Sequence, residues 1–211
     1  MHYERFVLGP LETNVYLLYT EGKEACLVDP VLRDKRLEGF IEKKGLVVES
    51  VVITHAHVDH FYDAESYVER YRVPVYMHEK AEALRPFFRA SCGMHGFAEK
   101  EMLEHYTPLN RITSFQVGEE SLRILTTPGH SLCGISLASG SFVITGDVLF
   151  KGDMGRYDLP GSSLAQLYAS LKKLAALPDE LEVLPGHLDL STLGAEKREN
   201  EYLKTALRSA G

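Results

Sequence analysis

The chain has 211 residues, of which 45% are hydrophobic and 25% charged, and its formal net charge is −7 with nine histidines counted as neutral. This composition is typical of a globular protein, and the length predicts one domain over residues 1–211 with a sizeable core. It excludes a disordered or fibrous chain, and the acidic balance argues against binding to nucleic acid or to an anionic membrane.

The first third of the chain reads as short strands followed by alternating helices and strands. Strands are expected at residues 5–9, 14–20, 24–30, 49–54 and 73–77, and helices at residues 33–45 and 62–72. Leu37 and Ile41 share one face of the first helix, and Gly45 is expected to end it. The continuous apolar run before Thr54 predicts a strand that is buried on both faces.

The rest of the chain repeats this organisation after an irregular segment. Residues 79–111 contain Pro86, Gly93, Gly96 and Pro108 and are predicted to form broken helices and loop. Strands are then expected at residues 111–115, 122–128, 134–139, 141–146 and 182–186, and helices at residues 164–175 and 194–207. The order gives two similar halves, each a sheet with flanking helices. The sequence therefore predicts an α/β chain folded as a four-layer αββα sandwich.

Three histidines and an aspartate crowd into the segment "THAHVDH" that follows the strand at residues 49–54. If the extended geometry persists, His55 and His57 fall on one side of the chain, whereas Asp59 and His60 follow after the chain has turned. Two groups of ligands from one loop indicate two neighbouring metal ions. Imidazole and carboxylate together suit zinc, iron or manganese, and imidazole also suits copper and nickel.

Further ligands are expected where other strands end. "TTPGH", "ITGD" and "VLPGH" end strands at His130, Asp147 and His187, because Pro and Gly stop a strand and leave the next residue in a loop. One buried histidine is more often a core residue than a ligand, and "PGH" alone is a weak signal. The whole set is a strong one, since two metal ions that share a carboxylate and a water need about seven side chains.

The segments "THAHVDH", "TPGHS", "TGDVLF" and "LPGH", in this order and at these separations, resemble the metallo-β-lactamase superfamily, and within it the small glyoxalase-II-like hydrolases. The likeness runs from "GPLETNVYLL" to "TLGAEKREN", and "DVLFKGDMGRYDLPGSS" is similar to a stretch typical of the small members. It implies an αββα sandwich with the site on one edge. It also implies that the first metal is held by His55, His57 and His130, the second by Asp59, His60 and His187, and that Asp147 bridges both.

The same resemblance implies a dinuclear, metal-dependent hydrolase whose metal-bridging hydroxide cleaves a thioester such as S-lactoylglutathione or a related acyl-thiol. Zinc is the favoured metal, and iron or manganese also suit the site. Asp147 favours the glyoxalase-II-like branch because β-lactamases of the superfamily usually lack that carboxylate, and Asp59 is expected to take a proton as the intermediate collapses. Only 24 residues (211 − 187) follow His187, so the helical domain with which full-length glyoxalase II binds glutathione is not expected.

Several alternatives share these residues. A persulfide dioxygenase would use one iron on His55, His130 and Asp147, and a lactone or ester hydrolase would use the same site as a thioesterase. The full ligand set argues against a non-catalytic binding module, and the acidic balance argues against a nuclease. The expected partner is a small acyl-thiol substrate, with no nucleic acid and no membrane, and the sequence leaves the oligomeric state open.

Other residues near these motifs have two interpretations. Arg156, Tyr157 and Asp158 either support the ligands and line the pocket, as the resemblance suggests, or form a surface ion pair of little energetic value. Residues 86–108 form either a flap or an anchored loop, with an apolar set at Phe87, Phe88, Met94 and Phe97. The histidines that match no ligand pattern and are expected at the surface are His2, His78, His95 and His105.

Cysteine usage and the N-terminus bear on location. Cys26, Cys92 and Cys133 are odd in number and far apart, which predicts free thiols in a reducing compartment. "MHYERFVLGP" lacks a basic segment followed by an apolar core, and the sequence has no apolar run long enough to span a bilayer, so the cytoplasm is the expected location. Cys133 is expected to be a buried thiol rather than a nucleophile, because no base is assigned to it.

Overall fold

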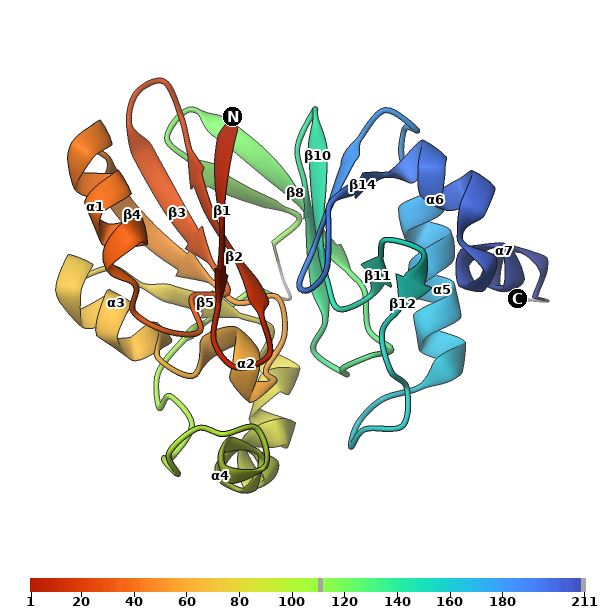
Figure 1. The fold of residues 1–211 in the computed structure, drawn as a ribbon, viewed down its shortest axis with the longest axis horizontal. Helices are drawn as coiled ribbons and strands as arrows, with labels where there is room; N and C mark the ends of the chain where they lie inside the picture. Colours follow the sequence, from red (N-terminus) through yellow and green to blue (C-terminus); the bar gives the residue numbers. More distant parts are fainter. Residues whose placement is uncertain (110–111, 210–211) are drawn as a thin grey trace.

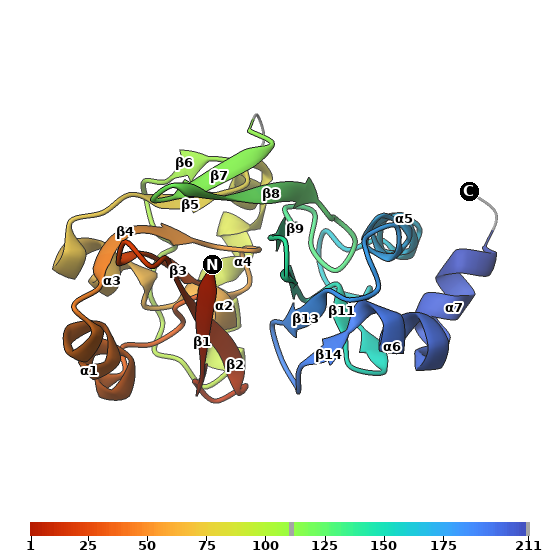
Figure 2. The same cartoon turned by 90° about the horizontal axis from the view of Figure 1, so that it is seen from above.

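A computed structural model of the protein describes residues 1–109 and 112–209. Two six-stranded sheets lie face to face, and helices cover the outer face of each sheet (Figure 1 and Figure 2). This is the four-layer αββα sandwich predicted from the sequence, with one sheet from each half of the chain. Within the described ranges, no helix combines the length and the hydropathy needed to cross a bilayer.

The N-terminal sheet keeps its strands in chain order. They are β1 (His2–Leu8), β2 (Thr13–Tyr19), β3 (Glu24–Val28), β4 (Val47–Val52), β5 (Val75–Met77) and β6 (Thr107–Pro108). The first three strands pair as antiparallel hairpins, and β3 to β6 run parallel. Parallel neighbours need crossovers, which α1 (Lys35–Lys44) and α3 (Ala64–Tyr71) provide on the outer face of the sheet. As predicted, α1 ends at Gly45, which has a left-handed φ of 63°.

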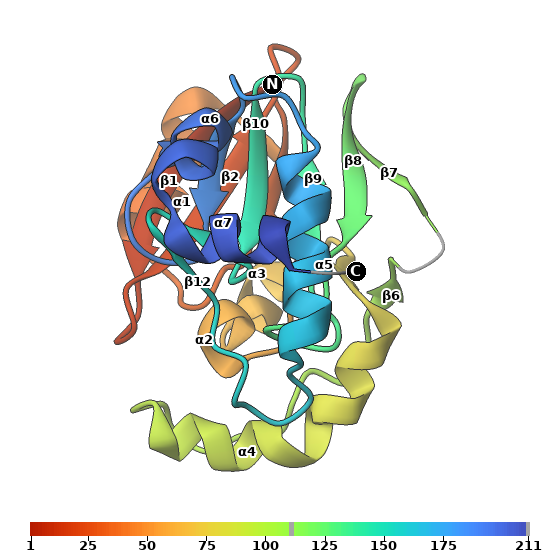
Figure 3. The ribbon, with the colours of Figure 1, turned by 90° about the vertical axis from the view of Figure 1, so that its right-hand side faces the viewer.

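The C-terminal sheet has the order β14-β13-β10-β9-β8-β7. Its strands are β7 (Ser114–Val117), β8 (Glu120–Thr126), β9 (Ile135–Ala138), β10 (Phe142–Gly146), β13 (Glu182–Pro185) and β14 (Ser191–Thr192). The parallel pair β10 and β13 is joined through α5 (Leu164–Ala175). With α6 (Leu193–Glu199) and α7 (Glu201–Arg208), α5 covers the outer face, as Figure 3 shows. A small hairpin, β11 (Leu149–Phe150) and β12 (Asp153–Met154), follows β10.

Successive side chains of the central strands alternate between apolar layers. Leu17 in β2 and Leu27 in β3 pack with the helices of their own half, whereas the next side chains, Leu18 and Val28, pack between the two sheets. A third layer joins the C-terminal sheet to its helices. Both faces of these strands are therefore covered, which explains why the run before Thr54 is apolar throughout.

In two regions the observed helices and strands differ in detail from the predicted ones. The helix expected over residues 194–207 is divided at Asn200, whose extended ψ of 108° ends α6 and whose side chain caps α7. The irregular segment contains the 3₁₀ helix η1 (Glu79–Leu84) and α4 (Arg85–Met94), in keeping with broken helices and loop. Residues 110–111 lie outside the described ranges, and the strand expected at residues 111–115 begins at Ser114.

Hydrogen bonds from β2 join the two sheets at one end of the sandwich. The Asn14 backbone N–H donates to Gly186 O at 2.7 Å. Its Nδ2 donates to Pro185 O and to Leu188 O, both at 2.9 Å. The Tyr16 hydroxyl donates to Pro185 O at 2.7 Å. The loop after β13, which belongs to the C-terminal half, is thereby held against the N-terminal sheet.

A buried polar network fixes the β11–β12 hairpin to the C-terminal helices. Asn200 Nδ2 donates to Phe150 O at 3.3 Å and to Asp153 O at 3.0 Å, and also to Glu196 Oε2 at 2.8 Å. The Gly152 N–H donates to the same Glu196 oxygen at 2.9 Å. Asn200 is fully buried and Glu196 is 3% exposed, so each lost partner would leave a buried polar group unpaired.

Replacing the amide of this network is expected to destabilise the fold. Asn200→Ala removes both the cap of α7 and the support of the hairpin, and should lower the free energy of unfolding by about 2–4 kcal/mol. Urea denaturation measures the change. Glu199→Ala, at an exposed neighbouring position, is the control and should lie within about 0.5 kcal/mol of the parent. A loss below about 1 kcal/mol in Asn200→Ala would show that the network is dispensable.

Candidate metal centre

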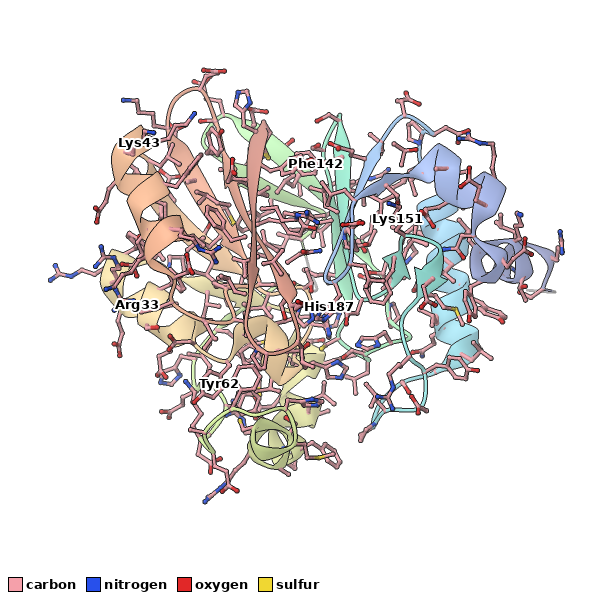
Figure 4. All side chains as sticks on the ribbon, in the orientation of Figure 1. Arg33, Lys43, Tyr62, Phe142, Lys151 and His187 are labelled. Atoms are coloured by element: carbon pink, nitrogen blue, oxygen red, sulfur yellow. The ribbon has the colours of Figure 1, made fainter. Side chains whose placement is uncertain are left out.

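The seven side chains predicted as ligands converge between the two sheets, at the end of the sandwich where the loops after the central strands meet. Figure 4 shows His187 there, between the two halves and above α4 in that view. The contributing segments are the loop after β4 with His55 and His57, the short helix α2 (Val58–Phe61) with Asp59 and His60, and the loops after β8, β10 and β13 with His130, Asp147 and His187.

The first two histidines are brought together by a bend in the chain and not by the extended geometry that was expected. The strand β4 ends at Val52, and the chain bends at residues 54–55, so extended geometry does not persist to His57. The loop nevertheless brings the rings of His55 and His57 to a centroid distance of 4.7 Å, in an edge-to-face arrangement. Loop conformation, rather than strand alternation, therefore places these two ligands together.

The donor atoms form neighbouring groups. Three sets, each with all donor atoms within 4.8 Å of one another, are His55, His57 and His130; His55, His60 and Asp147; and Asp59, His60 and His187. Asp147 lies between the first and last sets: Oδ2 is 3.5 Å from His130 Nε2, and Oδ1 is 3.3 Å from His60 Nε2. Asp59 Oδ2 is 3.2 Å from His187 Nε2. The arrangement can hold two ions side by side.

A buried carboxylate that sequence reasoning missed orients two of these histidines. Asp29 Oδ2 accepts from His60 Nδ1 at 2.9 Å and from the Thr54 hydroxyl at 2.7 Å. Because the Thr54 hydroxyl is already a donor, it accepts from His55 Nδ1 at 3.1 Å. Both hydrogen bonds use Nδ1 and therefore leave Nε2 as the ring nitrogen that faces the centre. Asp29 directly follows β3, so the strand-end rule that found the other ligands would also have found this residue.

Backbone carbonyls orient two further histidines in the same way. His130 Nδ1 donates to Arg156 O at 3.0 Å, and His187 Nδ1 donates to Leu11 O at 2.9 Å. Their Nε2 atoms are left to face the carboxylates. His57 differs from these rings because it directs Nδ1 toward the cluster, where Nδ1 lies 2.8 Å from His130 Nε2. Each of the five rings thus directs one nitrogen inward.

The donor set fits divalent metal ions. Within the described part of the chain, His55 Nε2, His60 Nε2 and Asp147 Oδ1 are buried side-chain atoms that make no hydrogen bond. A buried polar atom without a partner costs about 1–3 kcal/mol, so three at one point indicate a partner of another kind. Imidazole nitrogens and carboxylate oxygens are the ligands of zinc, iron and manganese sites.

Protonation in the cluster follows from burial and from the neighbouring charges. Burial lowers the pKa of His57 to about 3, with a further contribution from His130, so the ring is neutral. Burial alone would raise the pKa of Asp59, but the charge of His60 and the hydrogen bond from His187 lower it to about 2. For His187, burial is outweighed by hydrogen bonds to two carboxylates, which raise its pKa to about 9. The carboxylate side of the cluster therefore attracts positive charge.

Glycines in both "PGH" segments are required by close approach as well as by the turn. A Cβ at Gly186 would overlap Asp147 Oδ1 and would lie 2.7 Å from His60 Cε1. Gly129 has a φ of 142°, and a Cβ there would overlap the backbone of Leu167 in α5. The glycine before His187 thus leaves room for two ligands, while the glycine before His130 lets the loop pack on a helix.

Arg156 combines the two roles considered for residues 156–158, which were support of a ligand and a surface ion pair. Arg156 acts through its carbonyl, which orients His130, while its guanidinium forms an exposed ion pair with Asp158 at 2.9 Å. Tyr157 is 48% exposed.

Of the histidines expected at the surface, His78 is buried, so that prediction was wrong. Its ring accepts from the Lys80 N–H and caps η1. Cys133 is buried as predicted, and burial raises the pKa of its thiol.

A cavity of about 570 Å³ opens onto this cluster. His57, Asp59 and Asp147 lie on its inner wall, and α4 forms much of the outer wall. Of the four apolar residues considered for a flap, Phe87, Phe88 and Met94 line the cavity. The fourth, Phe97, is buried instead against Tyr62 with ring centroids 4.6 Å apart. The segment is therefore anchored at one point and contributes to the cavity at others.

The sequence also matches a known family. Residues 8–187, which include all seven side chains, fit the profile of the metallo-beta-lactamase superfamily. The chain belongs to this superfamily. It is 31% identical to the probable metallo-hydrolase YqgX of Bacillus subtilis, over 96% of this chain and 98% of that protein. It is 27% identical to the hydroxyacylglutathione hydrolase GloC of Haemophilus influenzae, over 97% and 99% of the two chains.

Solved structures share the fold. TTHA1623 in a di-iron-bound form is 35% identical with a TM-score of 0.85, over 94% of this chain and 99% of that chain. The BLEG-1 B3 metallo-beta-lactamase is 30% identical with a TM-score of 0.87, over 96% and 99% of the two chains. The resemblance stated from the sequence motifs and the αββα architecture are both confirmed.

The short distances from Gly186 to Asp147 and His60 predict the effect of adding a side chain at this position. Gly186→Ala should displace Asp147 and His60 and weaken the binding of divalent metal by about 10- to 100-fold, as loss of ligand support does elsewhere. Metal titration followed by calorimetry measures the affinity. Gly140→Ala is the matched control, because no atom lies within 4 Å of a Cβ added there. Equal affinity in both variants would contradict the placement of Asp147.

Proposed function

We propose that the protein is a metal-dependent hydrolase that cleaves a thioester at a dinuclear centre. One ion is assigned to His55, His57 and His130, the other to Asp59, His60 and His187, and Asp147 lies between them as the shared ligand. Zinc is the favoured metal on the chemistry of this donor set, and iron and manganese suit the same ligands. The di-iron-bound form of TTHA1623 supports a centre of two ions.

The observation that carries the proposal is the position of Asp147. Its Oδ2 lies 3.5 Å from both His130 Nε2 and His187 Nε2, which belong to different groups of ligands. A carboxylate in this place suits two ions that share one ligand, and two-metal sites are typical of hydrolytic enzymes. The relation to GloC, a hydroxyacylglutathione hydrolase over nearly the same length, supports a thioester as the substrate class.

The reaction adds water across the thioester. Its oxygen bonds to the carbonyl carbon, the carbon–sulfur bond breaks, and a carboxylate and a thiol are released. Divalent ions bound at such a site would polarise the carbonyl and lower the pKa of a water, to about 7 in the case of zinc. Asp59, which is ionised at neutral pH, would accept one proton of the water at Oδ2 as the intermediate collapses and pass it to the leaving thiolate, and the other proton is released to solvent. Hydrogen bonds from Nδ1 to Leu11 O and Arg156 O keep His187 and His130 oriented.

Removing the shared carboxylate tests the proposal. Asp147→Ala is expected to lower kcat/KM for thioesters, S-lactoylglutathione among them, on the order of a hundredfold or more, because both groups of ligands lose a member. Asp189→Ala, an exposed carboxylate in the loop after His187, is the control and should keep the parent rate. Rates near the parent value in Asp147→Ala would rule out the shared-ligand role.

Metal analysis tests the centre independently of substrate. Protein purified without added metal is expected to contain about two zinc, iron or manganese ions per chain by elemental analysis. Removing them with a chelator should abolish thioester hydrolysis and lower Tm, because ions that bind only the folded state stabilise it. Returning one kind of metal should restore both. A single iron per chain would instead favour a persulfide dioxygenase, which oxygen uptake with glutathione persulfide would reveal.

A further inference from the structure

The cavity beside the metal centre has an apolar wall that the proposed chemistry does not require. Leu84, Phe87, Phe88 and Met94 of η1 and α4 form one side, and Met154 of the β11–β12 hairpin also lines it. Its volume of about 570 Å³ falls within the range of pockets that enclose small organic ligands. The space is far larger than a lactoyl or acetyl group needs.

Apolar side chains are also exposed at this cavity. Leu11 is 39% exposed, Phe87 52%, Met94 81% and Leu188 57%, and all four line it. They come from three separate segments: the loop between β1 and β2, α4, and the loop after β13. Exposed apolar side chains that gather round one hollow indicate a binding site for an apolar group rather than chance exposure.

The charges around the cavity point the same way. Among the described residues that line it, the only lysine or arginine is Arg156, and its guanidinium is already paired with Asp158. Glutathione carries two carboxylates, which proteins usually bind through arginine or lysine. Asp153 also lines the cavity and adds negative charge. The cavity therefore suits an uncharged, apolar arm of the substrate.

We propose that this cavity binds the acyl chain of the thioester and that the enzyme prefers apolar acyl groups of about four to eight carbons over lactoyl or acetyl groups. The inference rests on the proposed function, since the scissile carbonyl must lie at the metal centre. The acyl arm is assigned to the cavity because the common thiol carriers are polar and charged. Phe87 and Met94 on α4 are then specificity residues that contact the chain without touching the reacting atoms.

A substrate series with one constant thiol tests the preference. For acetyl, butanoyl, hexanoyl and octanoyl thioesters of N-acetylcysteamine, kcat/KM is expected to rise about three- to fourfold per buried methylene until the chain fills the cavity. A parallel series keeps the acetyl group and lengthens an alkyl thiol. Equal rates along the acyl series, or a rise confined to the alkyl-thiol series, would overturn the assignment of the acyl chain.

Variants of α4 connect the preference to the cavity. The double variant Phe87→Gln, Met94→Gln places polar groups on the wall at two exposed positions, where it should not disturb folding. The hexanoyl-to-acetyl ratio of kcat/KM is expected to fall at least about fivefold. Val47→Gln, at an aliphatic position in β4 that is 61% exposed, is the control and should keep the ratio. An unchanged ratio in the double variant would contradict the role of α4.

A binding measurement separates failure of this inference from failure of the proposed function. Titration calorimetry compares hexanoate with acetate, both products of the series. Tighter binding of hexanoate that is lost in the double variant would support the cavity assignment even if no thioester were hydrolysed, in which case only the proposed reaction would fail. Hydrolysis without any dependence on chain length, and with equal binding of the two acids, would overturn the cavity assignment and leave the reaction standing.

Discussion

The structure depends on bringing five imidazoles and two carboxylates to one buried point between the sheets. Polar and charged groups taken out of water cost several kcal/mol each unless other groups compensate them. Compensation here comes from outside the cluster: Asp29 and Thr54 hold two of the rings, and carbonyls of Arg156 and Leu11 hold two more. What stays uncompensated is a set of inward-facing donor atoms, and these are the atoms that a divalent ion would bind.

The fold around this point holds ligands from the two sheets at short distances from one another. Both halves of the chain supply ligands, so the relative position of the sheets has to be set to within fractions of an ångström. Asn14 and Tyr16 do this by bonding β2 of one sheet to the loop that carries His187 in the other. Gly186 removes the side chain that would stand between Asp147 and His60. The relative position of the ligands therefore rests on several contacts that are individually weak.

The candidate metal ligands and the apolar cavity wall lie in different parts of the molecule. The ligands lie in loops that follow regular strands and in the short helix α2, whereas one apolar part of the cavity wall comes from η1 and α4, in the irregular segment before the second sheet. Loops and short helices on a fixed scaffold can change without disturbing the core. The cavity wall at positions such as Phe87 and Met94 can therefore differ while the ligand set stays the same, which is why the ligand motifs alone leave the substrate open.

The sequence by itself determined the αββα architecture and all seven inward-facing side chains, because apolar continuity, strand-end placement and the spacing of "THAHVDH" are local properties of the chain. It did not determine that Asp29 orients His60, that Arg156 acts through its carbonyl, or that His78 is buried. It also left open whether the apolar residues after Pro86 anchor a loop or face a cavity. The contacts of Asp29 and Arg156 join residues distant in the chain, and the burial of His78 depends on the elements that pack over it, so only tertiary packing could decide them.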